Sequence, residues 1–168
     1  MRMTAPRLSA ALPARWLIAS SLLVGGLLWA TPAAAAGPPF AASGSFVQTS
    51  FVQSNVRSAD GVTFFDFTEH DTLSGTLSGT SVIQGSCVVR ASGQGVCQAV
   101  ETFTGTVAGR TGTVQFRDVV SLDTTAGTSQ GRFTIVSGTG DLANLRGHGT
   151  FRGLGTTGTY TGRLVFAP

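Results

Sequence analysis

The chain has 168 residues, with 11 basic and 8 acidic residues, and a formal net charge of +3. Three of the Arg lie in the first 36 residues, so the remainder balances eight Arg against eight Asp and Glu. Its charge therefore does not indicate a nucleic-acid-binding domain, which needs clustered basic residues. Residues 37–168 have the size of a single domain.

Residues 1–36 have the layout of a secretory signal peptide. Three Arg accompany an apolar run over 16–30, and Ala34-Ala35-Ala36 supplies the small residues needed for cleavage before Gly37. The alternative is a permanent anchor, but the apolar run is shorter than the ~20 residues that a membrane-spanning helix needs. We therefore expect a cleaved leader, a secreted or periplasmic bacterial protein, and no stable membrane insertion.

The rest of the chain has the composition of β-strands. A short linker is expected over 37–43 and one domain over 44–168. Proline is absent from 40 to 167, and Thr, Val and Phe recur between breaks marked by Gly, a pattern typical of strands and tight turns. These breaks predict eight strands, over 44–57, 62–73, 80–90, 96–106, 111–122, 130–137, 147–153 and 157–166.

The predicted connections are too short for parallel neighbours. Asp60-Gly61 is a hairpin turn, and Ala108-Gly109-Arg110 joins the fourth strand to the fifth. Alternating apolar and polar residues in the fifth and eighth strands predict one buried and one exposed face. An all-β, eight-stranded antiparallel barrel follows, with a β-sandwich as the alternative. The one helical feature expected is a short turn over 141–146, capped by Asp141 and ended by Gly147.

Cys87 and Cys97 flank a Ser- and Gly-rich segment that resembles a hairpin tip. In an exported protein, such an isolated pair predicts a disulfide between neighbouring strands. A redox-active or metal-binding pair is the alternative, but the C-x-x-C spacing and a nearby His are both missing.

Two segments resemble a known family. Residues 101–113 and the GTGxLxxLxGxGxF pattern over 138–151 are similar to a bacterial family of uncharacterised domains related to the allene oxide cyclase and dirigent barrels. The resemblance covers roughly 62–166. It implies an eight-stranded barrel with a central cavity, and it implies no reaction.

Two acidic residues interrupt apolar faces and are candidates for a cavity. Glu101 shares strand parity with Phe103, and Asp118 shares parity with Phe116. A buried carboxylate is costly unless it is paired or serves a site. If a cavity exists, Glu101, Asp118 and Tyr160 are its expected polar groups. We expect Arg132, in the next strand, to neutralise one of the acids; the alternative is a structural ion pair or exposure at a strand end.

Other patterns in the sequence imitate known sites. The segment 127–131 reads G-x-S-x-G around Ser129, with Asp141 and His148 in the order of a hydrolase triad. That motif requires a strand-to-helix elbow in an α/β sheet, whereas a strand follows here. The glycines at 138–140 lack the helix of a dinucleotide site. His70 lies between two acids and could be taken for a metal ligand. Neighbouring strand residues point to opposite faces, however, so a solvated strand end is the favoured interpretation.

The sequence therefore favours a non-catalytic, exported barrel that binds a small apolar or amphipathic ligand. No cofactor, metal or nucleic acid is expected, and oligomerisation is left open. The alternatives are an isomerase or cyclase like the plant barrels, with Glu101 as acid or base, and a dirigent-like interaction protein of the cell envelope.

Overall fold

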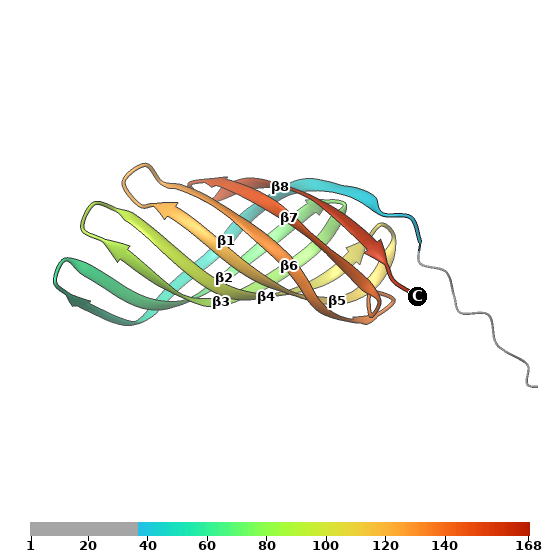
Figure 1. Ribbon diagram of the computed structural model, residues 1–168, viewed down its shortest axis with the longest axis horizontal. Coiled ribbons are helices and arrows are strands. Elements are labelled where there is room, and N and C mark those ends of the chain that lie inside the picture. Colours follow the sequence, from blue (N-terminus) through green and yellow to red (C-terminus); the bar gives the residue numbers. More distant parts are fainter. Residues whose placement is uncertain (1–36) are drawn as a thin grey trace, which may run out of the picture. The chain divides into compact units, whose positions relative to one another are not determined.

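A computed structural model describes residues 37–168, and the predicted leader lies outside this part. Eight strands pair antiparallel in sequence order, and β8 closes on β1 to form a barrel (Figure 1). The strands are β1 (Phe40–Ala59), β2 (Val62–Gly75), β3 (Leu77–Arg90), β4 (Gln94–Val107), β5 (Arg110–Asp123), β6 (Thr128–Gly140), β7 (Leu145–Leu154) and β8 (Thr157–Phe166). The barrel expected from the sequence is confirmed, and the sandwich is not formed.

The first strand begins earlier than the sequence suggests. Residues 40–43, expected in a linker, belong to β1 and pair with β8, where Phe40 is opposite Leu164. Ala42 is buried in the barrel interior. This pairing completes the ring of hydrogen bonds at the end of the barrel where the two termini of the described chain meet.

Tight turns connect the hairpins. Asp60 and Gly61 have φ values of 52° and 74°, and Ala108 and Gly109 have φ values of 49° and 80°. Positive φ at both central residues characterises the turn whose twist matches that of the flanking strands. The Asp60-Gly61 hairpin is therefore as predicted, and the Ala108 turn places a non-glycine residue in the same conformation.

The helical turn predicted over 141–146 is not a helix, and residues 37–168 contain no α-helix. The amides of Leu142 and Ala143 donate to carbonyl oxygens three residues earlier, and β7 begins at Leu145 before an α-helical bond can form. Gly147 lies inside β7. Leu142 and Leu145 are fully buried, so this turn nevertheless closes one end of the barrel. In the described part of the chain, no helix is long and apolar enough to cross a membrane.

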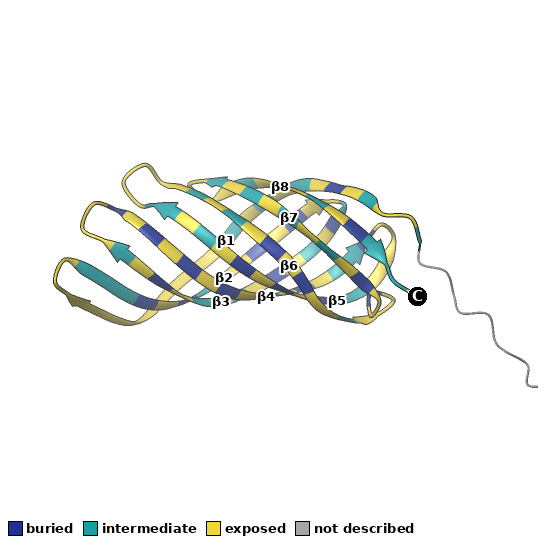
Figure 2. Cartoon of the chain, viewed as in Figure 1, coloured by how far each residue is buried: buried dark blue, intermediate teal, exposed yellow. Residues whose placement is uncertain are grey.

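Buried and exposed residues alternate along the strands (Figure 2). The inward side chains form two apolar clusters. The sealed cluster, at the end with the termini, comprises Ala42, Leu73, Leu77, Phe103, Val107, Val114, Phe116, Phe133, Ile135, Leu142, Leu145, Tyr160 and Leu164. The open cluster comprises Phe65, Phe67, Cys87, Cys97 and Ala99.

The predicted disulfide is present in the open cluster. Cys87 and Cys97 are direct partners on β3 and β4, with a Cα–Cα distance of 4.1 Å and a bonded Sγ pair. Both residues point inward and are buried. The two cysteines are ten residues apart in the sequence, so the crosslink joins the two strands of the β3–β4 hairpin close to its tip.

Candidate ligand-binding cavity

The barrel interior holds a cavity of about 370 Å³ that extends from the acidic side chains in the middle of the barrel to the open end. This volume lies within the range of small-molecule sites. Phe side chains form much of its wall, and the disulfide is part of the lining. Exposed residues of the 124–128 and 155–156 turns border the cavity, so its mouth lies at this end.

Glycines opposite the Phe rings make room for them. A Cβ atom at Gly149 would lie 2.2 Å from Cζ of Phe133, and one at Gly158 would lie 2.2 Å from Cζ of Phe46. Side chains at these inward positions of β7 and β8 would displace the rings. These glycines of β7 and β8 therefore provide space for the aromatic side chains of their direct partners on the neighbouring strands β6 and β1.

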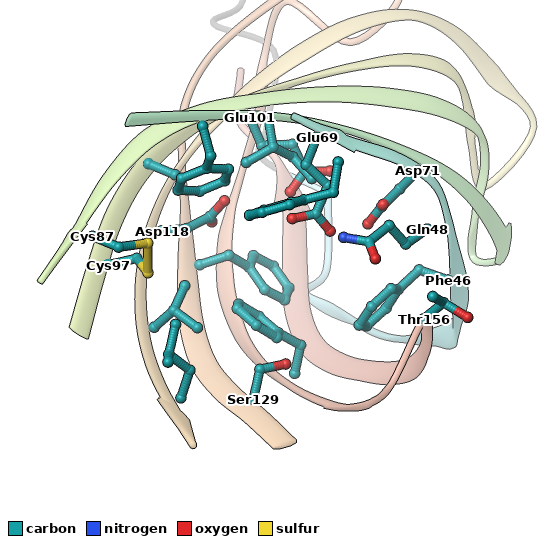
Figure 3. Close-up of a pocket in the computed structure, with 18 of the residues that line it drawn as sticks. Phe46, Gln48, Glu69, Asp71, Cys87, Cys97, Glu101, Asp118, Ser129 and Thr156 are labelled. Atoms are coloured by element: carbon teal, nitrogen blue, oxygen red, sulfur yellow. A yellow bond between two sulfur atoms is a disulfide. The ribbon is translucent and has the colours of Figure 1, made fainter. Parts of the chain in front are cut away.

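Five carboxyl groups line the cavity. Asp123 is the last residue of β5, beside the turn at the mouth, and the other four lie deeper in the barrel. We call these four the acidic ring. Glu69 and Asp71 come from β2, Glu101 from β4 and Asp118 from β5. Each occupies an inward position because strand residues alternate between faces. Figure 3 shows the labelled carboxyl groups together with the amide of Gln48 inside the barrel. The acidic ring thus lies where the sealed cluster meets the open cluster.

The acidic ring has few polar partners. The Ser81 hydroxyl donates a short hydrogen bond to Oε1 of Glu101. Asp71 and Asp118 expose only 6% and 4% of their surface, and their Oδ1 atoms have no hydrogen-bond partner among the described residues. No Arg, Lys or His of residues 37–168 lines the cavity. Buried oxygens of this kind are costly and often indicate a functional site.

Burial makes these acids weak. It raises the pKa of Asp118 to about 8, with the charges of Glu101 and Glu69 adding to the shift. Burial, then the charge of Asp71, raises the pKa of Glu69 to about 8, opposed by a hydrogen bond from Gln48. Near neutral pH the acidic ring is therefore only partly ionised.

The other two carboxyl groups shift in the same direction. Burial raises the pKa of Glu101 to about 7, although the hydrogen bond from Ser81 lowers it. Burial also raises the pKa of Asp71, against a hydrogen bond with Glu69 and the charge of His70. Because the four groups interact, their protons are lost in steps that belong to the cluster as a whole.

Tyr160 joins the acidic ring to the sealed cluster. Its hydroxyl accepts a hydrogen bond of 2.8 Å from the Leu77 amide and donates to the carbonyl of Ser74 at 3.1 Å. Burial raises the pKa of the phenol. The side chain lines the cavity, and its hydroxyl holds the β2–β3 turn against β8.

The structure brings together three of the four cavity residues expected from the sequence. Glu101, Asp118 and Tyr160 all line the interior. Arg132 does not, and the expectation that it neutralises an acid is wrong. Phe133 is the β6 residue opposite Asp118, so its neighbour Arg132 points outward, into a shallow groove shared with Arg117 and Arg163.

Sequence reasoning missed Glu69, Asp71 and Gln48. The signal was present in β2, where Phe65, Phe67, Glu69, Asp71 and Leu73 have the same strand parity and all turn inward. The segment around His70 was interpreted as a solvated strand end. Of its three ionisable residues, only His70 faces outward, whereas Glu69 and Asp71 face the cavity.

The imitated sites are not assembled. Ser129 borders the cavity mouth, whereas His148 lies in the outer groove and Asp141 is exposed in the β6–β7 turn. These side chains therefore do not form a triad. Within residues 37–168, no three His, Cys, Asp or Glu are grouped so that they could hold a metal ion.

Comparisons with known proteins agree with this architecture. The model of the family described as protein of unknown function DUF3224 matches residues 42–161. The chain belongs to the DUF3224 family. A crystal structure of a DUF3224 protein of unknown function from Shewanella oneidensis MR-1 has a TM-score of 0.66 and 20% sequence identity, covering 78% of this chain and 100% of that one. At this identity the likeness concerns the DUF3224 fold alone. No curated protein matches the sequence.

Proposed function

We propose that this DUF3224 domain is an exported binding protein that encloses a small, largely apolar molecule in its barrel. The observation that carries the proposal is the cavity of about 370 Å³, which is lined mainly by Phe and aliphatic side chains and bordered by a few polar groups. Apolar walls with a small number of polar groups are typical of small-molecule sites. Export is part of the proposal because of the leader-like segment and the disulfide.

The two ends of the barrel support entry from one side. Leu142 and Leu145 are fully buried at the end with the termini, where they block access to the interior. At the other end, exposed turn residues border the cavity, and Phe51 is 43% exposed. An apolar molecule would therefore enter between the turns and contact the open cluster first.

Titration with a neutral apolar dye, N-phenyl-1-naphthylamine, tests this function by fluorescence. We expect saturable binding to the mature domain and its loss in Ala99→Phe, which places a ring in the cavity. Val100→Phe is the matched control, because Val100 is the outward neighbour on β4. Val120→Phe, nearer the mouth, serves if Ala99→Phe does not fold. The proposal would be contradicted if the native domain did not bind the dye, or if Ala99→Phe and Val120→Phe bound it as tightly as the native domain does.

Glu101 favours a second candidate, an isomerase or cyclase like the plant barrels that the sequence resembles. Burial raises the pKa of Glu101 to about 7, and Ser81 orients its carboxyl group. A pKa near the working pH suits a general acid or base. Conversion of unsaturated-lipid epoxides by the native domain, compared with Glu101→Gln, tests this idea. Equal rates for native domain, variant and buffer would exclude it for the substrates examined.

A further inference from the structure

Among the described residues the acidic ring has no positive partner, although it lies deep in the barrel. The Oδ1 atoms of Asp71 and Asp118 are unpartnered within residues 37–168, and both side chains are more than nine-tenths buried and line the cavity. A cavity that served only apolar molecules would be better built with apolar side chains at these positions, because each buried acid costs stability. Residues 37–168 supply no positive partner for these acids, and we therefore seek that partner in a bound molecule.

The chemistry of that partner follows from the sign of the charge and from the walls. All ionisable groups facing the cavity are acidic: Glu69 and Asp71 from β2, Glu101 from β4, Asp118 and Asp123 from β5, and the phenol of Tyr160 from β8. The remaining strands contribute neutral side chains such as Gln48, Ser81, Ser129, Phe133 and Phe151. An anion would be repelled by this arrangement once any of the acids is ionised.

A bare metal ion does not suit the cavity. Among the described residues, no three acidic or other ligating side chains are close enough to hold one ion. The acids are instead spread over β2, β4 and β5 and face Phe rings. A protonated amine matches this arrangement, because its N–H groups can donate to separate carboxylates and its charge is attracted by aromatic faces.

We infer that the cavity selects an organic cation, a molecule with an apolar body of small-molecule size and a protonated amine that binds Asp71 and Asp118. This inference rests on the proposed binding function and specifies its ligand class. The amine lies at the acidic ring, and the apolar body lies along the open cluster toward the mouth. Binding then supplies the positive charge that residues 37–168 do not place inside the barrel.

Proton release accompanies such binding. In the empty barrel the acidic ring is only partly ionised near neutral pH, since burial raises the pKa values of Glu69, Glu101 and Asp118. An ammonium ion favours the ionised form, so the acidic ring loses protons to solvent when the amine binds. Affinity for the amine therefore rises with pH through the range from about 6 to 8.5, as long as the amine itself stays protonated.

Three probes that share a chain length test the inference by isothermal titration calorimetry: decylamine, decanol and decanoate. We expect decylamine to bind about tenfold more tightly than decanol at pH 8, the effect of one hydrogen bond between charged groups, and decanoate to bind most weakly. Titrations in buffers of different ionisation enthalpy should show proton release with decylamine and none with decanol. Equal affinity for decylamine and decanol, or preference for decanoate, would overturn the inference.

Isosteric variants assign the effect to the acidic ring. Asp118→Asn and Asp71→Asn should each lower decylamine affinity about tenfold and leave decanol affinity unchanged. Asp66→Asn is the matched control, because Asp66 lies on the outer face of β2. Unchanged decylamine affinity in both inward variants would contradict the assignment.

The outcomes separate this inference from the function on which it depends. If the neutral dye and decanol bind but decylamine has no advantage, the barrel binds ligands and the amine selectivity is wrong. If none of the four probes binds, the proposed function fails as well. Addition of Mg²⁺ or Ca²⁺ alone should produce no binding heat, and a saturable response would show that the acidic ring is a metal site instead.

Discussion

The two apolar clusters of the barrel differ in what they do, although β2, β3 and β4 contribute to both. In the sealed cluster, Phe103, Leu142 and Leu164 are fully or almost fully buried and fill the interior. In the open cluster, Phe65 and Phe67 border a cavity, and a disulfide replaces part of the packing. One end of the barrel thus stabilises the fold, and the other leaves room for a ligand.

The acidic ring marks the boundary between these regions. Apolar packing excludes water on the sealed side, which is the cause of the raised pKa values, while the open side leaves the carboxyl groups accessible. Buried carboxyl groups at such a boundary lower the stability of the fold, which is consistent with the proposed ligand-binding role. The following predictions test whether the two ends differ in this way.

Loss of a large ring should distinguish the two ends most strongly. Phe103→Ala creates a void in the sealed cluster and should lower the free energy of unfolding by about 3–5 kcal/mol. Phe67→Ala extends an existing cavity, so the cost should be close to the transfer free energy of the side chain alone, about 2 kcal/mol. Urea unfolding of both variants measures the difference. Equal losses would show that the open end is packed as tightly as the sealed end.

Removal of the disulfide should affect the open end most. Cys87→Ala with Cys97→Ala should lower the free energy of unfolding by about 2–3 kcal/mol, the value for a loop of this length. Amides of β6 and β7 that exchange by global unfolding should lose this amount of protection, and amides of the β3–β4 hairpin that open locally should lose more. If the protection is lost uniformly, the disulfide does not act on the open end in particular.

The pH dependence of stability should originate in the acidic ring. A carboxyl group with a raised pKa in the folded state binds its proton more tightly there, so stability is full below pH 4 and falls as pH rises to about 8. Asp118→Asn removes one such group. Because burial favours the protonated form of Asp118, we expect the variant to gain stability relative to the native domain as the pH rises, with a larger gain at pH 9 than at pH 5.

Thermal unfolding of native domain and Asp118→Asn between pH 5 and 9 measures this effect, with Asp66→Asn as the exposed control. A native melting temperature that is flat across this range would contradict the burial of ionisable groups in the barrel.

The smallest expected effect on stability concerns the hydrogen bond between the Tyr160 hydroxyl and the Leu77 amide. Tyr160→Phe removes the acceptor of the Leu77 amide and leaves a buried N–H without a partner. The expected loss is about 1–2 kcal/mol in urea unfolding. Thr159→Val, on the outward face of β8, is the control. If Tyr160→Phe lowers the free energy of unfolding no more than Thr159→Val does, water accepts the hydrogen bond of the Leu77 amide in place of the phenol.

Much of the barrel could be predicted from the sequence because its connections are short and its strands alternate. Hairpins such as the one at Asp60-Gly61 leave little choice of partner strand, so each strand pairs with the next one in the sequence from β1 to β8. The closure of β8 on β1 depends on residues far apart in the chain, which no local pattern reveals. Residues 141–144 show where local patterns mislead. Their sequence favours a helical turn, but β7 begins at Leu145 and leaves no room for one.

The cavity was only partly predictable. Parity identified Glu101 and Asp118 as inward residues, and the same rule excludes Arg132, whose neighbour Phe133 is buried. Pairing Arg132 with an acid assumed that adjacent strands bring their charges to one face, but the register places Asp118 opposite Phe133. How far the side chains fill the interior depends on contacts between strands that are distant in the sequence, for example of Phe46 on β1 against its partner Gly158 on β8.

The inward placement of four acids also changes how the outside of the domain behaves. Residues 37–168 carry equal numbers of Arg and acidic residues, but four of the eight acids belong to the acidic ring. When those four are protonated, the domain balances eight Arg against only four other acids, which are Asp60, Asp66, Asp123 and Asp141. A domain whose ionisable residues sum to zero therefore migrates as a cation below neutral pH, and it is retained on an anionic matrix until the interior ionises.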